Sequence, residues 1–255
     1  MEKKREVLFM PIIYLSPSTQ ENNYYVTGGT EEQYMNLLAD KMVPYLDASG
    51  IRYTRNTPSM TAASSIAASN AGNYDLHLAL HSNAAPEGRY GTVRGSIVFY
   101  YPGSTEGQRA AEIIADGLKA IYPLPNLVRA EGTTAIGEVR RVRAPSVFLE
   151  LAYHDNEADA NWIVNNLDAI ARNLVLSLTE YFGIPFYAAE LNLSATVDVS
   201  WGVLNIRAQP NTGAPILAQA PDGAPLTVLN RSNGWYLVDY NGTIGYASSD
   251  FITLT

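Results

Sequence analysis

The chain has 255 residues, of which 47% are hydrophobic, and its 25 acidic and 17 basic residues give a net charge of −8. This length allows one large domain or two modest ones, and the apolar content excludes a globally disordered chain. The acidic balance argues against a nucleic-acid binder, because that class usually presents a basic surface. Cysteine is absent, which excludes disulfides, thiolate metal sites and cysteine nucleophiles. No apolar run approaches the roughly 18 residues of a membrane span.

The first 185 residues alternate between strand-like and helix-like segments. Basic residues at 3–5 and the apolar run 7–15 together resemble a secretory signal, but Pro11 interrupts the run and no small-residue cleavage site follows, so we expect a buried strand. The pattern then predicts, in order, a helix over 30–49, strands at 76–80 and 96–101, a helix at 108–121, a strand at 147–151, and one long helix from Asn156 to Gly183. This alternation indicates an α/β domain whose mostly parallel sheet is flanked by helices.

The pattern changes after Pro185. Turn-forming pairs such as Asn233-Gly234 and Asn241-Gly242 recur about every ten residues and separate short strand-like runs. These runs lie at 203–207, 226–229, 235–239, 244–247 and 251–254. They predict a small all-β barrel. We therefore expect a first domain over residues 1–185, a linker over 186–194 and a second domain over 195–255.

The three histidines of the chain are the first candidates for chemistry. His77 and His81 share a face of one predicted strand but lie about 13 Å apart along it, so one metal ion does not easily take both. His81 is followed by Ser82 and Asn83 and therefore ends its strand, at the edge where open α/β sheets bind ligands. His77 lies deeper, and a core role is the simpler interpretation.

Carboxylates occupy two further element ends. Glu150 closes a buried strand, which is costly unless the charge is paired or used, and an arginine from 140–143 is the structural explanation. Glu31 and Glu32 suit the first turn of a helix, because the helix dipole favours acidic residues there. From that turn, either carboxylate also reaches the edge of the sheet at which His81 lies. Two carboxylates and a histidine resemble a zinc hydrolase site, in which three ligands leave one position for water and a separate glutamate takes its proton.

Three stretches carry a closer resemblance. They read EQYMNLLA from Glu32, DLHLALHSNA around His81, and PSVFLELAYHDN around Glu150. In their order and spacing, residues 7–183 resemble the zinc-dependent N-acetylmuramoyl-L-alanine amidases of the Amidase_3 type. The resemblance implies that Glu32 and His81 bind zinc and that Glu150 is catalytic.

One position departs from that family. Its other zinc histidine lies in a loop after the first strand, where this chain has Thr19 followed by Gln20. A hydroxyl or an amide oxygen is a poor zinc ligand beside imidazole or carboxylate. Three alternatives stay open: Gln20, or else His154, completes the site; zinc binds through Glu32 and His81 with waters; or metal and activity are lost.

Residues 195–255 resemble the bacterial SH3-like domains that accompany wall hydrolases. The similar stretches are LNIR from Leu204, NGWY ending at Tyr236, and GYAS around Tyr246. The resemblance implies recognition of wall peptide, with Trp235 and Tyr246 among the contact aromatics. Cysteine peptidases of the wall often carry this module, but the lack of cysteine excludes them.

Together the two resemblances imply a peptidoglycan hydrolase of the autolysin kind, located in the cell wall or outside the cell. It is expected to cleave the amide bond between N-acetylmuramic acid and L-alanine with zinc as cofactor, and Asn83 and Arg143 are candidate substrate contacts. Two alternatives are a wall-binding pseudo-amidase and a zinc carboxypeptidase-like peptidase. The expected partner is peptidoglycan, with no nucleic acid and no membrane span.

Overall fold

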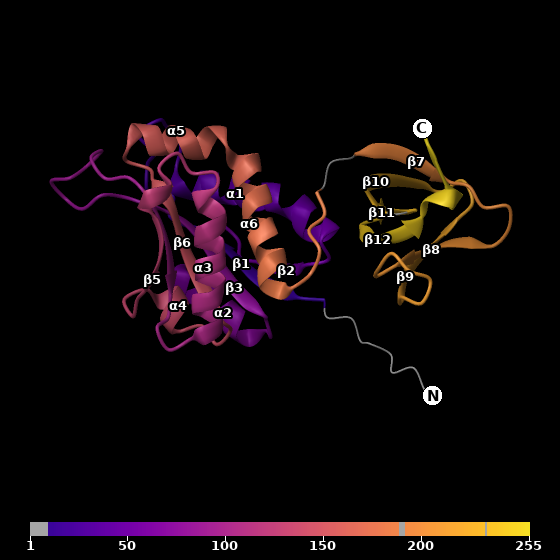
Figure 1. Cartoon of the computed structure of the whole chain (residues 1–255), viewed down its shortest axis with the longest axis horizontal. Helices are drawn as coiled ribbons and strands as arrows, with labels where there is room; N and C mark the ends of the chain where they lie inside the picture. Colours follow the sequence, from indigo (N-terminus) through magenta and orange to yellow (C-terminus); the bar gives the residue numbers. More distant parts are fainter. Residues whose placement is uncertain (1–9, 189–191, 233) are drawn as a thin grey trace. The chain divides into compact units, whose positions relative to one another are not determined.

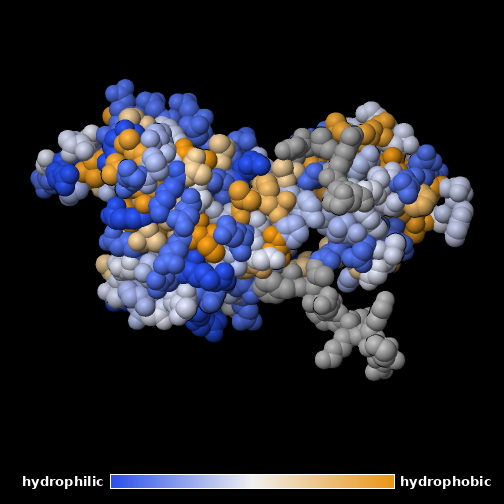
Figure 2. Space-filling model, viewed as in Figure 1, coloured by the Kyte–Doolittle hydropathy of each residue, from blue (hydrophilic) through white to orange (hydrophobic). Residues whose placement is uncertain are grey.

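The computed structural model describes residues 10–188, 192–232 and 234–255 (Figure 1). The chain forms two compact units, of which the first comprises the described residues up to Pro185 except Asp47–Gly50, and the second comprises Asp47–Gly50 and the described residues from Phe186 on. None of the helices in these residues combines the length and the hydropathy needed to cross a membrane. Figure 2 shows that hydrophilic residues cover much of the visible surface, with hydrophobic residues scattered between them.

A six-stranded sheet forms the centre of the first unit. Its strands, in spatial order, are β2 (Arg52–Arg55), β1 (Ile12–Pro17), β3 (Leu76–Asn83), β6 (Ser146–Tyr153), β4 (Ser96–Tyr100) and β5 (Val128–Gly132). The first four are mutually parallel, while β4 runs antiparallel to β6 and parallel to β5. The central strands β1, β3 and β6 are buried almost throughout, as expected where helices cover both faces. The predicted mostly parallel sheet is confirmed.

Helices connect and cover these strands. They are α1 (Glu31–Ala48), α2 (Ala62–Ala71), α3 (Thr105–Lys119), α4 (Gly137–Arg140), α5 (Glu157–Asn165) and α6 (Leu167–Phe182), with a 3-10 turn at Pro125–Leu127. Helix α3 packs against α6 and along β4–β6 (Figure 1). Its buried stripe includes Ala111, Ile114 and Leu118, which recur at helical spacing and predicted this helix.

Two details of the predicted elements differ from the structure. The long helix after Asn156 is two helices, because Asn166 leaves helical backbone geometry between α5 and α6. The Asn156 cap itself is confirmed, since its side chain accepts from the backbone N–H groups of Ala158 and Asp159. The predicted first strand starts in residues outside the described range, and β1 extends beyond it to Pro17.

The second unit is a seven-stranded antiparallel sheet in the order β13-β7-β10-β11-β12-β8-β9. The strands are β7 (Leu193–Val197), β8 (Val203–Arg207), β9 (Ile216–Pro221), β10 (Pro225–Ser232), β11 (Trp235–Tyr240), β12 (Thr243–Ser248) and β13 (Ile252–Leu254), with a 3-10 turn at Ser249–Phe251. The five predicted strands are confirmed, while β7 and β9 were not predicted. Strand β7 begins inside the segment expected to be a linker. The core of this unit contains Ile206, Val228 and Val238.

Candidate active site

Strands β3 and β6 bring the two main candidate residues together. His81 and Glu150 are paired across these neighbouring parallel strands, near the carboxyl end of each. Both strands are buried runs, so the sheet core holds them in register. The site therefore lies at the edge of the sheet that the sequence predicts.

The carboxylate that reaches His81 belongs to Glu31, the first residue of α1. Its Oε1 lies 2.7 Å from His81 Nδ1 and also accepts from the Ser82 backbone N–H, while Oε2 accepts from the Asn23 side-chain amide. Glu32, the residue expected at this place, is half-buried and has no described contact with His81. Successive helical residues point about 100° apart, so only one of the pair faces the sheet. The structure thus brings Glu31, and not Glu32, to the position beside His81.

Gln20 enters the site from the loop after β1. Its side-chain amide nitrogen lies 3.3 Å from His81 Nδ1, the ring nitrogen that Glu31 also contacts. The amide oxygen accepts from the Asn23 side chain at 3.0 Å, so it faces His81 only when the amide turns over. Thr19 lines a cavity of about 60 Å³ together with Gln20, His81 and Glu138. The loop therefore brings Gln20, which follows the replaced histidine, to the position of a third donor.

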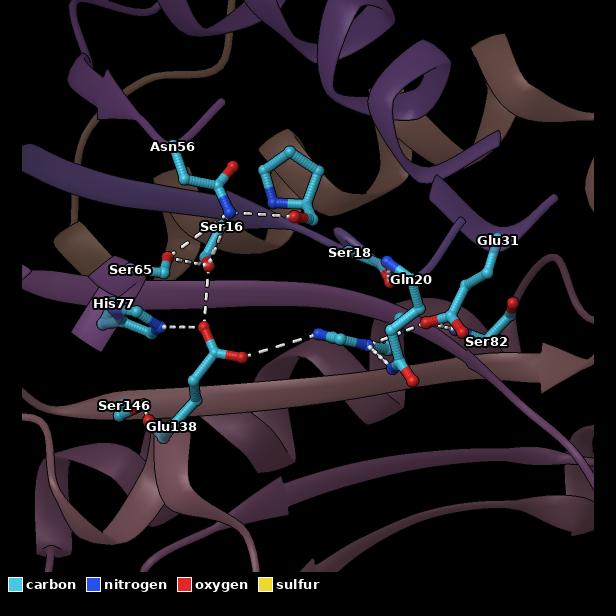
Figure 3. Close-up of polar contacts among 12 residues, drawn as sticks. Ser16, Ser18, Gln20, Glu31, Asn56, Ser65, His77, Ser82, Glu138 and Ser146 are labelled. Carbon is cyan, nitrogen blue, oxygen red and sulfur yellow. Dashed lines mark hydrogen bonds and ion pairs between the residues drawn. The ribbon is translucent and has the colours of Figure 1, made fainter. Parts of the chain in front are cut away.

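Glu138 of α4 is another buried carboxylate, which lies on the opposite side of the His81 ring from Glu31. The sequence did not predict it as a site residue. Its Oε1 accepts from Ser16 Oγ at 2.7 Å and lies 3.2 Å from His77 Nε2, while its Oε2 lies 3.5 Å from His81 Nε2 (Figure 3). Burial opposes its ionisation, but the hydrogen bonds with His77 and His81 lower the pKa of Glu138 to about 2. Ser16 and His77, two polar residues inside buried strands, were the signal for a buried partner.

His81 is thus held between two carboxylates. Burial by itself lowers the pKa of an imidazole, but hydrogen bonds to Glu138 and Glu31 raise the pKa of His81 to about 10. Burial likewise opposes ionisation of Glu31, and its contact with His81 lowers the Glu31 pKa below the ordinary value. The two carboxylates therefore favour the protonated form of His81, and a metal ion at this ring competes with a proton.

Glu150 differs from these paired carboxylates. The residue is half-buried, but its Oε2 is buried and has no hydrogen-bond partner in the described residues. An ion pair with an arginine from 140–143, the structural alternative, is not found there. Burial, and secondarily the charge of Glu31, raises the pKa of Glu150 to about 8, although His81 opposes that shift. Such a carboxylate is a proton acceptor that operates near neutral pH.

Three further candidates from the sequence are His154, Asn83 and Arg143, and only the first two lie near His81. His154 is buried, with Nδ1 3.0 Å from both the hydroxyl and the carbonyl oxygen of Ser82, so it supports the neighbour of His81. Asn83 ends β3, and its carbonyl accepts from the His154 backbone N–H. Arg143 precedes β6 and donates to the Asn70 carbonyl, roughly 23 Å along the strand from Glu150. The structure therefore does not bring Arg143 to the site.

The residues present fit a zinc ion with two strong ligands and one weak one. His81 Nδ1, a Glu31 oxygen and the Gln20 amide converge on one point, although no group of three His, Asp or Glu side chains suited to a metal occurs in the described residues. A zinc hydrolase also uses a separate glutamate that does not bind the metal, and the unpartnered Oε2 of Glu150 fits that requirement. The family to which the first resemblance points is generally zinc-dependent.

In the second unit, a cavity of about 520 Å³ lies among exposed aromatic side chains. It is lined by Trp201, Trp235 and Phe251, together with the polar residues Asn205, Arg207 and Gln219. Trp201 is 88% exposed and Trp235 is half-buried. Tyr246, which the sequence placed among the contact aromatics, is only 6% exposed and packs against Leu237 and Tyr187. Tyr246 is therefore not an exposed contact, and the sequence did not predict the two cavity aromatics Trp201 and Phe251.

Two family comparisons agree with this architecture. Residues 18–180 match the family described as N-acetylmuramoyl-L-alanine amidase (Amidase_3), and residues 202–253 match the bacterial SH3 domain. A curated relative, the putative N-acetylmuramoyl-L-alanine amidase YrvJ of Bacillus subtilis, is 37% identical over 59 residues. That match covers 23% of this chain and 11% of the relative.

Solved structures share the fold of the first unit. The CwlD amidase of Clostridioides difficile, solved in complex with the GerS lipoprotein, has a TM-score of 0.59 at 14% identity, over 68% of this chain and 98% of that one. The catalytic domain of the CD27L endolysin, which targets C. difficile, has a TM-score of 0.56 at 20% identity, over 67% and 97%. The amidase AmiC2 of Nostoc punctiforme has a TM-score of 0.59 at 14% identity, over 69% and 98%. At these identities the likeness concerns the fold.

Proposed function

The chain belongs to the N-acetylmuramoyl-L-alanine amidase family (Amidase_3), and from that premise we propose that it hydrolyses the amide bond between N-acetylmuramic acid and L-alanine in peptidoglycan. The observation that carries the proposal is the Oε2 atom of Glu150, which is buried without a hydrogen-bond partner in the described residues and lies on the strand beside His81. A carboxylate kept unpaired in the core is costly to stability, and catalysis is the use that explains it.

Each residue of the site has a role in this proposal. His81 and Glu31 hold zinc, and Gln20 adds its amide oxygen. When bound, zinc polarises the substrate carbonyl and lowers the pKa of its water. Glu150 accepts the proton of the attacking water and passes it to the amino nitrogen of L-alanine as the C–N bond breaks, which leaves a carboxylic acid and a free amine. Asn83, at the end of β3, is the substrate contact that stays in reach of this centre.

The cavity of the second unit supports wall binding as its function. Flat rings such as Trp201, Trp235 and Phe251 offer apolar faces that suit sugar rings and peptide side chains. Arg207, on the same cavity, is complementary to the carboxylates of wall peptides. We therefore place the protein in the cell wall or outside the cell, where the second unit concentrates the first on its substrate.

Product analysis on purified peptidoglycan tests the hydrolase, with Glu150→Gln as the control for contaminating activity. The amidase releases new amino ends of L-alanine and no new sugar reducing ends. Trimming from the carboxyl end of the peptides identifies a carboxypeptidase instead. A zinc-loaded protein that binds the wall and releases no product identifies a pseudo-amidase, and either result refutes the proposal.

A further inference from the structure

We propose that Glu138 is a positioning residue for His81, which fixes the ring so that its Nδ1 faces the metal side of the site. This inference rests on the proposed function, because it concerns how the same site holds its metal. It assigns a purpose to a buried carboxylate that lies outside the three family motifs.

The two nitrogens of His81 face two different carboxylates. Nδ1 lies 2.7 Å from Glu31 Oε1 and 3.3 Å from the Gln20 amide, while Nε2 lies 3.5 Å from Glu138 Oε2. One metal ion therefore cannot bind Nδ1 and also reach Glu138. This geometry excludes Glu138 as a ligand of an ion shared with Glu31, and it leaves Glu138 as the acceptor for the opposite side of the ring.

An acceptor at Nε2 decides which nitrogen keeps its proton. A neutral imidazole has one N–H, and a carboxylate beside Nε2 favours the tautomer that donates there. The Nδ1 lone pair then points at the metal side. Metal-binding histidines commonly donate their second ring N–H to a carboxylate in this way, which also raises the basicity of the ligand.

Glu138 is itself held in place by buried groups. Ser16 Oγ and His77 Nε2 both contact Oε1, and Ser69 Oγ lies 3.0 Å from the other nitrogen of His77. The hydroxyl of Ser146 bonds to the Glu138 carbonyl and ties the short helix α4 to β6. This network leaves Oε2 as the oxygen directed at His81. A site that lacks one strong ligand depends more on the orientation of the ligand it retains.

The experiment compares Glu138→Gln and Glu138→Leu with the wild type, using zinc alone as the probe. Zinc affinity is measured by competition with a chromophoric chelator. Nitrogen-15 NMR of the zinc-loaded protein identifies which His81 nitrogen carries the proton. We expect Glu138→Leu to weaken zinc binding by about 10- to 100-fold. Glu138→Gln, which keeps the size and an acceptor oxygen, should weaken it less. In the wild type, the proton should be on Nε2.

Ser69→Ala is the matched control, because it removes a buried hydroxyl of the same network without touching His81 or Glu138. It should leave zinc affinity within about twofold, since its contact ends at His77. The proposal is overturned if folded Glu138→Leu binds zinc like the wild type, or if zinc-loaded His81 carries its proton on Nδ1. If Glu138→Leu does not fold, Glu138→Gln decides, and unchanged zinc affinity and unchanged NMR signals in that variant overturn the proposal.

The same measurements separate this inference from the proposed hydrolysis. A wild type that binds zinc but does not cleave peptidoglycan refutes the amidase function, while the role of Glu138 is still decided by affinity and NMR. A wild type that binds no zinc leaves nothing for Glu138 to orient His81 toward, and it overturns the inference.

Discussion

The two units place their candidate functional groups in opposite environments. In the first unit, Glu31 and Glu138 are buried around His81, and Glu150 beside them is half-buried with its Oε2 atom enclosed. In the second unit, the candidate groups are aromatic rings, and Trp201 is almost fully exposed. The first arrangement strengthens electrostatic interactions by excluding water, which suits a reaction, whereas the second presents apolar area for a ligand to cover.

The two environments also affect the stability of the fold in different ways. Paired buried carboxylates are stabilised by their hydrogen bonds, but Glu150 lacks such a partner and therefore destabilises the fold in its charged form. An exposed tryptophan such as Trp201 forgoes the stabilisation that burial of a ring provides. Substitution at either kind of position should therefore impair function more than stability.

The largest effect is expected from Glu150→Gln. Hydrolysis of peptidoglycan should fall by about a hundredfold or more, because the variant has no basic carboxylate to accept the proton of water. The melting temperature at pH 7 should stay the same or rise, since the variant has no unpaired buried charge. A stable, zinc-loaded variant with undiminished product release would remove Glu150 from the mechanism.

The pH dependence of stability in the metal-free protein sharpens this prediction. The folded-state pKa of Glu150 is about 8, above its ordinary value of 4.5, so the folded state binds more protons between these two pH values. Its contribution to stability is therefore present below about pH 4.5 and is lost as the pH rises through 8. Thermal unfolding at several pH values should show a smaller decline across this window in Glu150→Gln than in the wild type.

The next largest effect distinguishes the two adjacent glutamates of α1. Glu31→Gln should weaken zinc binding by about tenfold or more, because it removes the negatively charged zinc ligand that lies against His81. Glu32→Gln is the matched control and should bind zinc like the wild type, because its side chain does not reach His81. Chelator competition measures both variants. The reverse ranking would show that Glu32 is the ligand.

A smaller effect is expected at the cavity of the second unit. Trp201→Ala should weaken binding to insoluble peptidoglycan by roughly tenfold, the loss typical of an aromatic contact, and leave the melting temperature unchanged. Ile216→Ala, another exposed apolar side chain on that unit but outside the cavity lining, is the control. Cosedimentation of the full chain with purified wall gives both values. Equal binding by the two variants would place the contact elsewhere.

The smallest expected effect is an increase in zinc affinity, in the variant Gln20→His. Gln20→His places an imidazole where an amide now approaches His81 Nδ1, and imidazole is the better zinc ligand. Zinc affinity should rise severalfold, with Gln20→Ala as the control that loses the weak donor. If Gln20→His and Gln20→Ala bind zinc equally, residue 20 does not contribute to the metal site.

Much of the architecture follows from local pattern. The apolar runs that became β3 and β6 are buried on both faces and flanked by helical periodicity, which is typical of a parallel sheet. Strand β2 was not predicted, because this four-residue edge strand alternates exposed and half-buried positions and has no continuous apolar run. The break at Asn166 was also missed, since the apolar spacing continues across it.

The sequence by itself determined the α/β class, the turn-rich second domain, and the placing of His81 and Glu150 in the carboxyl-terminal halves of their strands, because these depend on periodicity and on short-range turn chemistry. Both strands run further than predicted, to Asn83 and Tyr153. Only the tertiary structure decided that Glu31 rather than Glu32 faces His81, since the rotation of a helix is set by its packing against the sheet. It also brought Glu138 to His81 from 57 positions further along the chain. Such contacts are created by the packing of distant elements, and local sequence does not encode them.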